Sequence, residues 1–115
     1  MISTPYGDAF QDFSNDALRI RKYVDEVGEL YRGGKIGRLN TADAQFWAPE
    51  TPFSASYGKN YGVDFSELEF IMGGKLKEGQ EFITRGAPGL GNNPGGAIEV
   101  VTDPNAIKID FFHMP

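Results

Sequence analysis

Residues 97–112 read Ala-Ile-Glu-Val-Val-Thr-Asp-Pro-Asn-Ala-Ile-Lys-Ile-Asp-Phe-Phe and decide the fold class of the chain. The segment 97–102 is apolar and rich in β-branched residues, which predicts a strand. The Asp-Pro-Asn sequence at 103–105 predicts a turn, and apolar and polar residues alternate through 106–112, which predicts another strand. Short strands bounded by turn residues indicate a sheet that is largely antiparallel.

A helix is predicted upstream of these strands. Apolar residues recur at helical spacing through residues 15–27, after Ser14, which suits a helix N-cap, and before Gly28, which suits a helix C-terminus. Further strands are predicted at 29–32, 45–48, 68–72 and 81–84, and a second helix at 52–61. Gly73 and Gly74 predict a turn. Helix first and then mostly strands predicts an α+β domain with a largely antiparallel sheet.

The composition excludes several kinds of site. The chain has 115 residues, a usual length for one domain, and a formal net charge of −5, which disfavours general binding to nucleic-acid backbones. It has no cysteine and one histidine, His113, which excludes disulfides and Cys- or His-rich metal sites. We therefore expect a single domain over 1–115 without a metal. No apolar run approaches membrane length, and residues 1–13 predict a polar lead-in that lacks the pattern of a secretory signal.

Three predicted strands carry one arginine, one aromatic pair and one carboxylate. Arg32 follows Tyr31 and precedes two glycines, Phe46 and Trp47 are adjacent, and Glu99 lies between apolar residues. An arginine can hold a phosphate through two hydrogen bonds, an aromatic ring can stack on a heterocycle, and a carboxylate can stabilise a cationic transition state. This combination suits cleavage of a dinucleotide with a positively charged leaving group, which indicates NAD.

Each of these residues also has a purely structural interpretation. Arg32 suits the exposed end of a strand, and Trp47 suits the core of a small domain. Glu99 is predicted to share a face with Val101, so it lies either at an exposed edge or in a cleft. Residues 86–96 hold five glycines and two prolines and predict an irregular loop, whose position just before Glu99 favours the cleft.

Two other classes of function stay open. His113 with Arg85 or a lysine would form an acid–base pair for RNA cleavage without a metal. A non-catalytic binding or immunity-type protein would also suit the acidic charge.

The motifs together resemble the ADP-ribosyltransferase fold. They are Tyr-Arg-Gly at 31–33, Phe-Trp-Ala-Pro at 46–49 before a predicted helix, and Ile-Glu-Val-Val at 98–101 after a loop. That family is often described by an Arg, a Ser/Thr-bearing strand and a Glu. The chain is also similar to the small C-terminal toxin domains of polymorphic and contact-dependent bacterial toxins of the Rhs or CdiA type, on the basis of residues 83–89 and 93–99.

The resemblance implies a split sheet and a toxin domain cut from the C-terminus of a larger protein. It implies that Glu99 bonds the ribose 2′-hydroxyl of NAD and stabilises the cationic sugar as nicotinamide leaves, while Arg32 holds the phosphates and ribose. The other residues that it implies for the NAD site are Gly33, Phe46, Trp47, Ala48 and Tyr57. It further implies transfer of ADP-ribose to a protein or RNA target in interbacterial competition, secretion or delivery into the target cytoplasm, and a cognate immunity protein.

Two departures from the family pattern leave the acceptor open. The strand at 45–48 has no Ser-Thr-Ser, and Thr51 is the nearest hydroxyl. Ala97 stands two residues before Glu99, where arginine-modifying members usually carry Glu or Gln. The absence of this group disfavours an arginine acceptor and leaves open another acceptor, nucleic acid or water, and with water the activity becomes that of an NAD glycohydrolase.

Overall fold

The computed structural model describes residues 1–26, 28–34, 45–49, 70–87 and 97–114. These residues form one helix and eight strands in the order β1 (Ile2–Thr4), β2 (Gly7–Ala9), α1 (Asn15–Asp25), β3 (Leu30–Gly34), β4 (Phe46–Trp47), β5 (Phe70–Leu76), β6 (Phe82–Gly86), β7 (Ile98–Thr102) and β8 (Ile107–His113). The α+β class is therefore confirmed, and each predicted strand has an observed counterpart. The predicted helix at 52–61 lies outside the described residues. Within the part that is described, no helix is long and apolar enough to cross a membrane.

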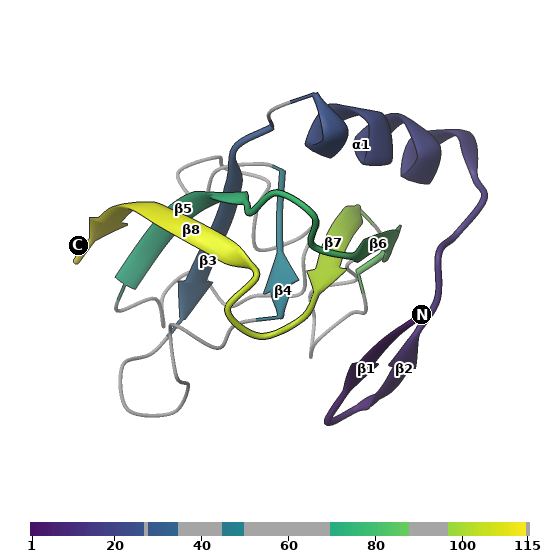
Figure 1. The fold of residues 1–115 in the computed structure, drawn as a ribbon, viewed down its shortest axis with the longest axis horizontal. Helices are drawn as coiled ribbons and strands as arrows, with labels where there is room; N and C mark the ends of the chain where they lie inside the picture. The colour runs from purple at the N-terminus through teal and green to yellow at the C-terminus, as the bar shows by residue number, and fades with distance from the viewer. Residues whose placement is uncertain (27, 35–44, 50–69, 88–96, 115) are drawn as a thin grey trace.

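The main strands form two antiparallel sheets, ordered β3-β5-β8 and β4-β7-β6 (Figure 1). One bridge joins them: the amide of Tyr31 donates to the carbonyl of Ala48 at 2.7 Å, and the amide of Ala48 donates back at 2.8 Å. The predicted turn at 103–105 carries the chain from β7 in one sheet to β8 in the other. Consecutive strands at the C-terminus therefore belong to different sheets.

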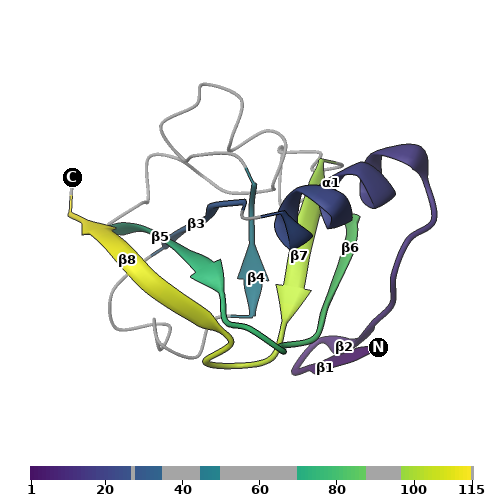
Figure 2. The same ribbon diagram turned by 45° about the horizontal axis from the view of Figure 1, so that its top comes forward.

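Helix α1 covers one face of this arrangement and closes the main core (Figure 2). It begins as predicted, because the Ser14 hydroxyl accepts a hydrogen bond from the amide of Ala17 at 3.2 Å. Its buried residues Ile20 and Val24 pack with apolar side chains from both sheets. These partners are Leu30, Trp47, Phe70, Met72, Phe82, Val100 and Ile107. The core thus holds the two sheets together on the helix side.

A short hairpin of β1 and β2 covers the opposite face of the β4-β7-β6 sheet, where the sequence predicted only a lead-in. Ile2 and Ala9 are buried against Ile83 and Val101, with Phe46 packed beside them. Strands of three residues are too short to show a clear alternation, so the pattern gave no signal. As a result, both faces of the β4-β7-β6 sheet are packed.

Gly73 and Gly74 lie inside β5, so the predicted turn at this position is wrong. Gly73 pairs with Phe111 and Gly74 pairs with Ile109, which leaves Asp110 as the extra residue of a β-bulge. A Cβ atom at Gly74 would collide with the backbone carbonyl of Lys108. Here glycine permits a close approach between paired strands instead of ending one of them.

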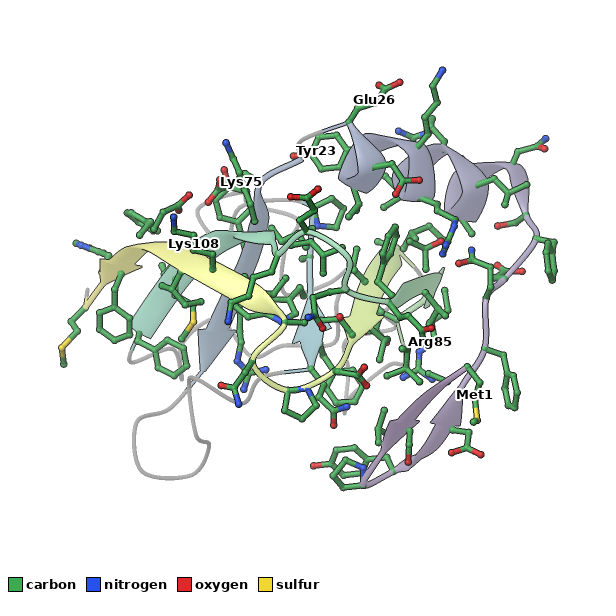
Figure 3. All side chains as sticks on the ribbon, viewed as in Figure 1. Met1, Tyr23, Glu26, Lys75, Arg85 and Lys108 are labelled. Carbon is green, nitrogen blue, oxygen red and sulfur yellow. The ribbon has the colours of Figure 1, made fainter. Side chains whose placement is uncertain are left out.

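A carboxyl pair lies over the same bulge. Glu29 is the residue before β3, and its carboxyl shares a hydrogen bond with Asp110. Its Oε1 atom lies close to Gly73, 3.0 Å from the point where a Cβ atom on that residue would stand. Burial, this hydrogen bond and the charge of Asp110 raise the pKa of Glu29 to about 7, and Lys75 opposes the shift. The hydroxyl of Tyr23 donates to the backbone carbonyl of Glu29 at 2.9 Å, so the end of α1 is joined to the chain just before β3 (Figure 3 labels Tyr23 and Lys75).

We predict that Gly74→Ala lowers the free energy of unfolding by about 2 kcal/mol, the scale of overpacking in a packed site. The backbone of Lys108 must shift to admit the new methyl group. Gly73→Ala is the matched control with the smaller expected loss, because its closest contact is the movable end of the Glu29 side chain. Urea denaturation measures both, and equal losses would contradict the explanation.

The carboxyl pair predicts a decline of stability with rising pH. Because the pKa of Glu29 is raised from 4.5 to about 7 in the folded protein, the folded state binds this proton more tightly than the unfolded state does. The resulting stabilisation is complete below pH 4.5 and is lost as the pH rises through 7. Glu29→Gln should flatten this decline in denaturation curves taken across that range, whereas the exposed-site control Glu78→Gln should keep it.

Candidate functional site

Glu99 lies on the middle strand of the β4-β7-β6 sheet, on the face that points away from α1. Its neighbour Val100 belongs to the core under the helix, whereas Val101 packs with the hairpin on the opposite face. Alternation places Glu99 on the same face as Val101, as predicted. The residue is 7% exposed, and its strand is not an edge strand. The interpretation of Glu99 as an edge-exposed carboxylate is therefore wrong.

Arg85 is the counter-charge of Glu99. The register of β6 and β7 pairs the two residues directly, and Arg85 Nε donates to Glu99 Oε2 at 2.9 Å. Burial raises the pKa of Glu99, while the hydrogen bond and the positive charge of Arg85 act to lower it. The carboxylate thus depends on this guanidinium to stay ionised in a site with little water.

One aromatic ring, that of Phe46, adjoins this ion pair, and the ring of Tyr6 lies next to it. The guanidinium carbon of Arg85 lies 5.8 Å from the centre of the Phe46 ring, and the ring of Tyr6 lies 6.1 Å from that of Phe46 at 52°. Tyr6 comes from the turn between β1 and β2. Arg85 projects from β6 on the side of the hairpin, away from α1 (Figure 3). One face of the sheet therefore gathers a carboxylate, a guanidinium and two aromatic rings.

The structure does not bring Arg32 to Glu99. Arg32 lies opposite Met72 on the neighbouring strand and, two residues after Leu30, shares a face of β3 with it. Both of these apolar residues belong to the core under α1. Glu99 lies on the hairpin face. The bridge between the sheets agrees, because it puts Tyr31 on the same face as Ala48 and therefore puts Arg32, the next residue, on the opposite face. Arg32 is buried, and the strand register puts the two predicted catalytic residues on opposite faces.

The predicted aromatic residues divide between the two faces. Trp47 pairs with Val100 and lies in the core under α1, whereas Phe46 pairs with Val101 and lies on the Glu99 face. Alternation puts Ala48 on the Phe46 face. Gly33 pairs with Ile71 on β5. Of the predicted set, Phe46 is the aromatic residue that accompanies Glu99 among those described.

Some predicted site residues cannot be assigned a place near Glu99. Tyr57 and residues 88–96 of the glycine-rich loop lie outside the described residues. His113 ends β8 close to the C-terminus and is exposed, while Arg85 lies on the other side of the molecule (Figures 1 and 3). The expected pair of His113 and Arg85 is therefore not assembled.

Two residues of this face were not predicted as partners of Glu99. Arg85 could have been found by pairing the strands predicted at 81–84 and 97–102, since an antiparallel register sets residue 85 opposite residue 99. Tyr6 left no signal, because the hairpin that carries it was not predicted. No group of His, Asp and Glu suited to a metal occurs in the portion of the chain that is described.

A separate cavity of about 520 Å³ lies between α1, the N-terminal strand and β6. Its polar lining includes Gln11, Arg21 and Glu81. The guanidinium of Arg21 is already engaged there: it donates to Gln11 Oε1 and to the Phe82 carbonyl, both at 2.9 Å, and stacks on the Phe82 ring. Neither Glu99 nor Arg32 lines this cavity.

We predict that Arg85→Met lowers the free energy of unfolding by about 2 kcal/mol at pH 7, because it leaves a buried carboxylate without its counter-charge. The loss should be smaller at pH 4, where a carboxyl with a raised pKa is mostly protonated. Chemical denaturation at the two pH values measures the difference. The double variant Arg85→Met/Glu99→Gln is the control and should recover part of the loss at pH 7, since no lone charge remains. A loss independent of pH would contradict the role of the ion pair.

No family model, curated protein or solved structure matches this chain.

Proposed function

We propose that the chain is a toxin domain that cleaves the nicotinamide–ribose bond of NAD and transfers ADP-ribose to a macromolecule. The observation that carries the proposal is the buried Glu99 carboxylate, held by Arg85 beside the Phe46 ring on one face of the sheet. The ADP-ribosyltransferase-like form of the fold is part of the same proposal. It is supported by the split antiparallel sheet and by a glutamate on a central strand that follows a glycine-rich segment.

Glu99 is the catalytic residue in this proposal. Loss of nicotinamide builds positive charge on the ribose, and a fixed carboxylate in a site of low water content stabilises that charge more than it stabilises the neutral ribose of bound NAD. The ionised form is the active one, and Arg85 favours ionisation against the effect of burial. Phe46 offers an aromatic surface on the same face for a flat ring of the substrate. Arg32 lies on the other face, so it receives no contact with Glu99 here.

The acceptor and the biological setting follow from the resemblance to bacterial toxin domains. We propose a protein or RNA acceptor in the cytoplasm of a target cell that the toxin reaches by secretion or delivery, and an immunity protein that covers the Glu99 face. The small Ala97 side chain two residues before Glu99 offers no polar group to an acceptor. Hydrolysis of NAD by water is therefore the alternative activity of the same site.

We predict that the purified chain releases nicotinamide from NAD and that Glu99→Gln lowers this rate by about 100- to 1,000-fold, the usual effect of losing one electrostatic group in a transition state. Glu78→Gln removes an exposed carboxylate in a turn and should leave the rate unchanged. Chromatography of nicotinamide and free ADP-ribose measures the reaction. Nicotinamide released without an equal amount of free ADP-ribose indicates transfer, and equal amounts indicate hydrolysis.

Two outcomes would reject this function. One is an absence of nicotinamide release at any substrate concentration from a folded sample. The other is loss of toxicity in cells with His113→Ala but not with Glu99→Gln, a result that would favour RNA cleavage instead.

A further inference from the structure

We propose that Arg85, Phe46 and Tyr6 form a binding subsite for a phosphate-bearing nucleotide, in which Arg85 holds the phosphate. The inference deepens the proposed function and rests on it for the identity of the substrate, NAD. The binding step itself is testable without catalysis.

The donors of Arg85 are the first observation. A guanidinium has five N–H donors, and Nε donates to Glu99. Among the residues that the structure describes, the two terminal Nη groups make no hydrogen bond. The Arg85 side chain is 29% exposed, whereas that of Glu99 is 10% exposed. Toward the described residues, the terminal end of this partly exposed guanidinium therefore keeps the paired donors that fit two phosphate oxygens.

The rigidity of this guanidinium is the second observation. Its Nε atom is hydrogen-bonded to Glu99 on the neighbouring strand, and its guanidinium carbon lies 5.8 Å from the centre of the Phe46 ring. Both neighbours come from strands of one sheet, β7 and β4. An arginine that is already oriented by a hydrogen bond loses less freedom when it binds an anion, which favours binding by a single cation in a chain with a net charge of −5.

The aromatic neighbour on the hairpin is the third observation. Tyr6 is 85% exposed, yet its ring lies 6.1 Å from that of Phe46. The hairpin turn is fixed locally, because the Thr4 hydroxyl donates to the Gly7 carbonyl at 2.6 Å and accepts from the Tyr6 amide at 3.1 Å. Tyr6 therefore provides an exposed ring next to Phe46, the residue whose ring lies near the guanidinium, as expected for a surface that stacks a base or a pyridine ring.

The charges of Arg85 and Glu99 predict opposite changes in ligand affinity when one or the other is removed. Glu99 competes with an incoming phosphate for the charge of Arg85. If Arg85 binds phosphate, removal of the Glu99 charge strengthens the binding of a phosphate-bearing ligand, whereas removal of the Arg85 charge weakens it. If Arg85 only compensates for the burial of Glu99, neither change has this pattern.

Calorimetric titration with ADP-ribose and with adenosine tests the subsite. Arg85→Met should weaken ADP-ribose binding about 10-fold and leave adenosine binding unchanged, because only ADP-ribose carries phosphate. Glu99→Gln should strengthen ADP-ribose binding by about 3-fold or more. Tyr6→Ala should weaken both ligands. Arg19→Met is the matched control, since Arg19 is an exposed residue of α1 whose ion pair with Asp16 lies far from this face in the fold.

A second variant separates binding from folding. Arg85→Met/Glu99→Gln removes both charges and leaves no lone buried carboxylate, so it should fold and still bind ADP-ribose as weakly as Arg85→Met does. Unchanged ADP-ribose affinity in Arg85→Met or in the double variant would overturn the subsite, and so would an absence of ADP-ribose binding by the unaltered chain.

Nicotinamide release separates the two proposals. If ADP-ribose binding depends on Arg85 while NAD is not cleaved, the subsite is supported and the proposed activity is rejected. If NAD is cleaved while Arg85→Met keeps full affinity for ADP-ribose, the activity is supported and the subsite is rejected.

Discussion

The ion pair between Arg85 and Glu99 is the interaction on which the β4-β7-β6 sheet depends. Both faces of this sheet are packed, by α1 on one side and by the β1-β2 hairpin on the other, so a carboxylate on its middle strand loses much of its water. Burial alone would favour the protonated form. A slip of one residue between β6 and β7 would move Arg85 to the helix side and leave Glu99 without its counter-charge. The ion pair therefore selects the register as well as the charge state.

The second sheet is held in a different way, by close backbone contact and a shared proton. Gly74 lets β5 approach the backbone of Lys108 at the bulge, and Gly73 leaves room for the carboxyl of Glu29. Glu29 and Asp110 share a hydrogen bond there. One sheet thus has a pair of opposite charges, whereas the other has two carboxyl groups whose contact raises the pKa of one of them. We therefore expect the two sheets to respond differently to pH.

The sequence predicted what depends on neighbours along the chain, and it failed where partners on other strands decide. The cap at Ser14, the helix and the strand positions follow from local pattern. Gly74 was predicted as a turn, because a glycine pair in isolation does not reveal that another backbone lies against it. Whether Arg32 and Glu99 share a face depends on the bridge between the two sheets, which no local pattern encodes. Tyr6 could not be predicted, since its hairpin has strands of only three residues.

A carboxylate that is paired with a cation is a weaker stabiliser of positive charge than a free one, which argues against a catalytic role for Glu99 in the ligand-free protein. The geometry of Arg85 resolves this conflict within the proposed function. In the proposed subsite a phosphate on the terminal nitrogens would share the charge of the guanidinium with Glu99 and leave the Nε hydrogen bond in place, so Glu99 would keep its orientation and the partner that favours its ionised form while its charge is less fully offset. The carboxylate would then stabilise positive charge more strongly with a phosphate-bearing substrate in the site than without one. The same pair that makes the buried carboxylate tolerable in the empty protein would thus make its reactivity dependent on the substrate.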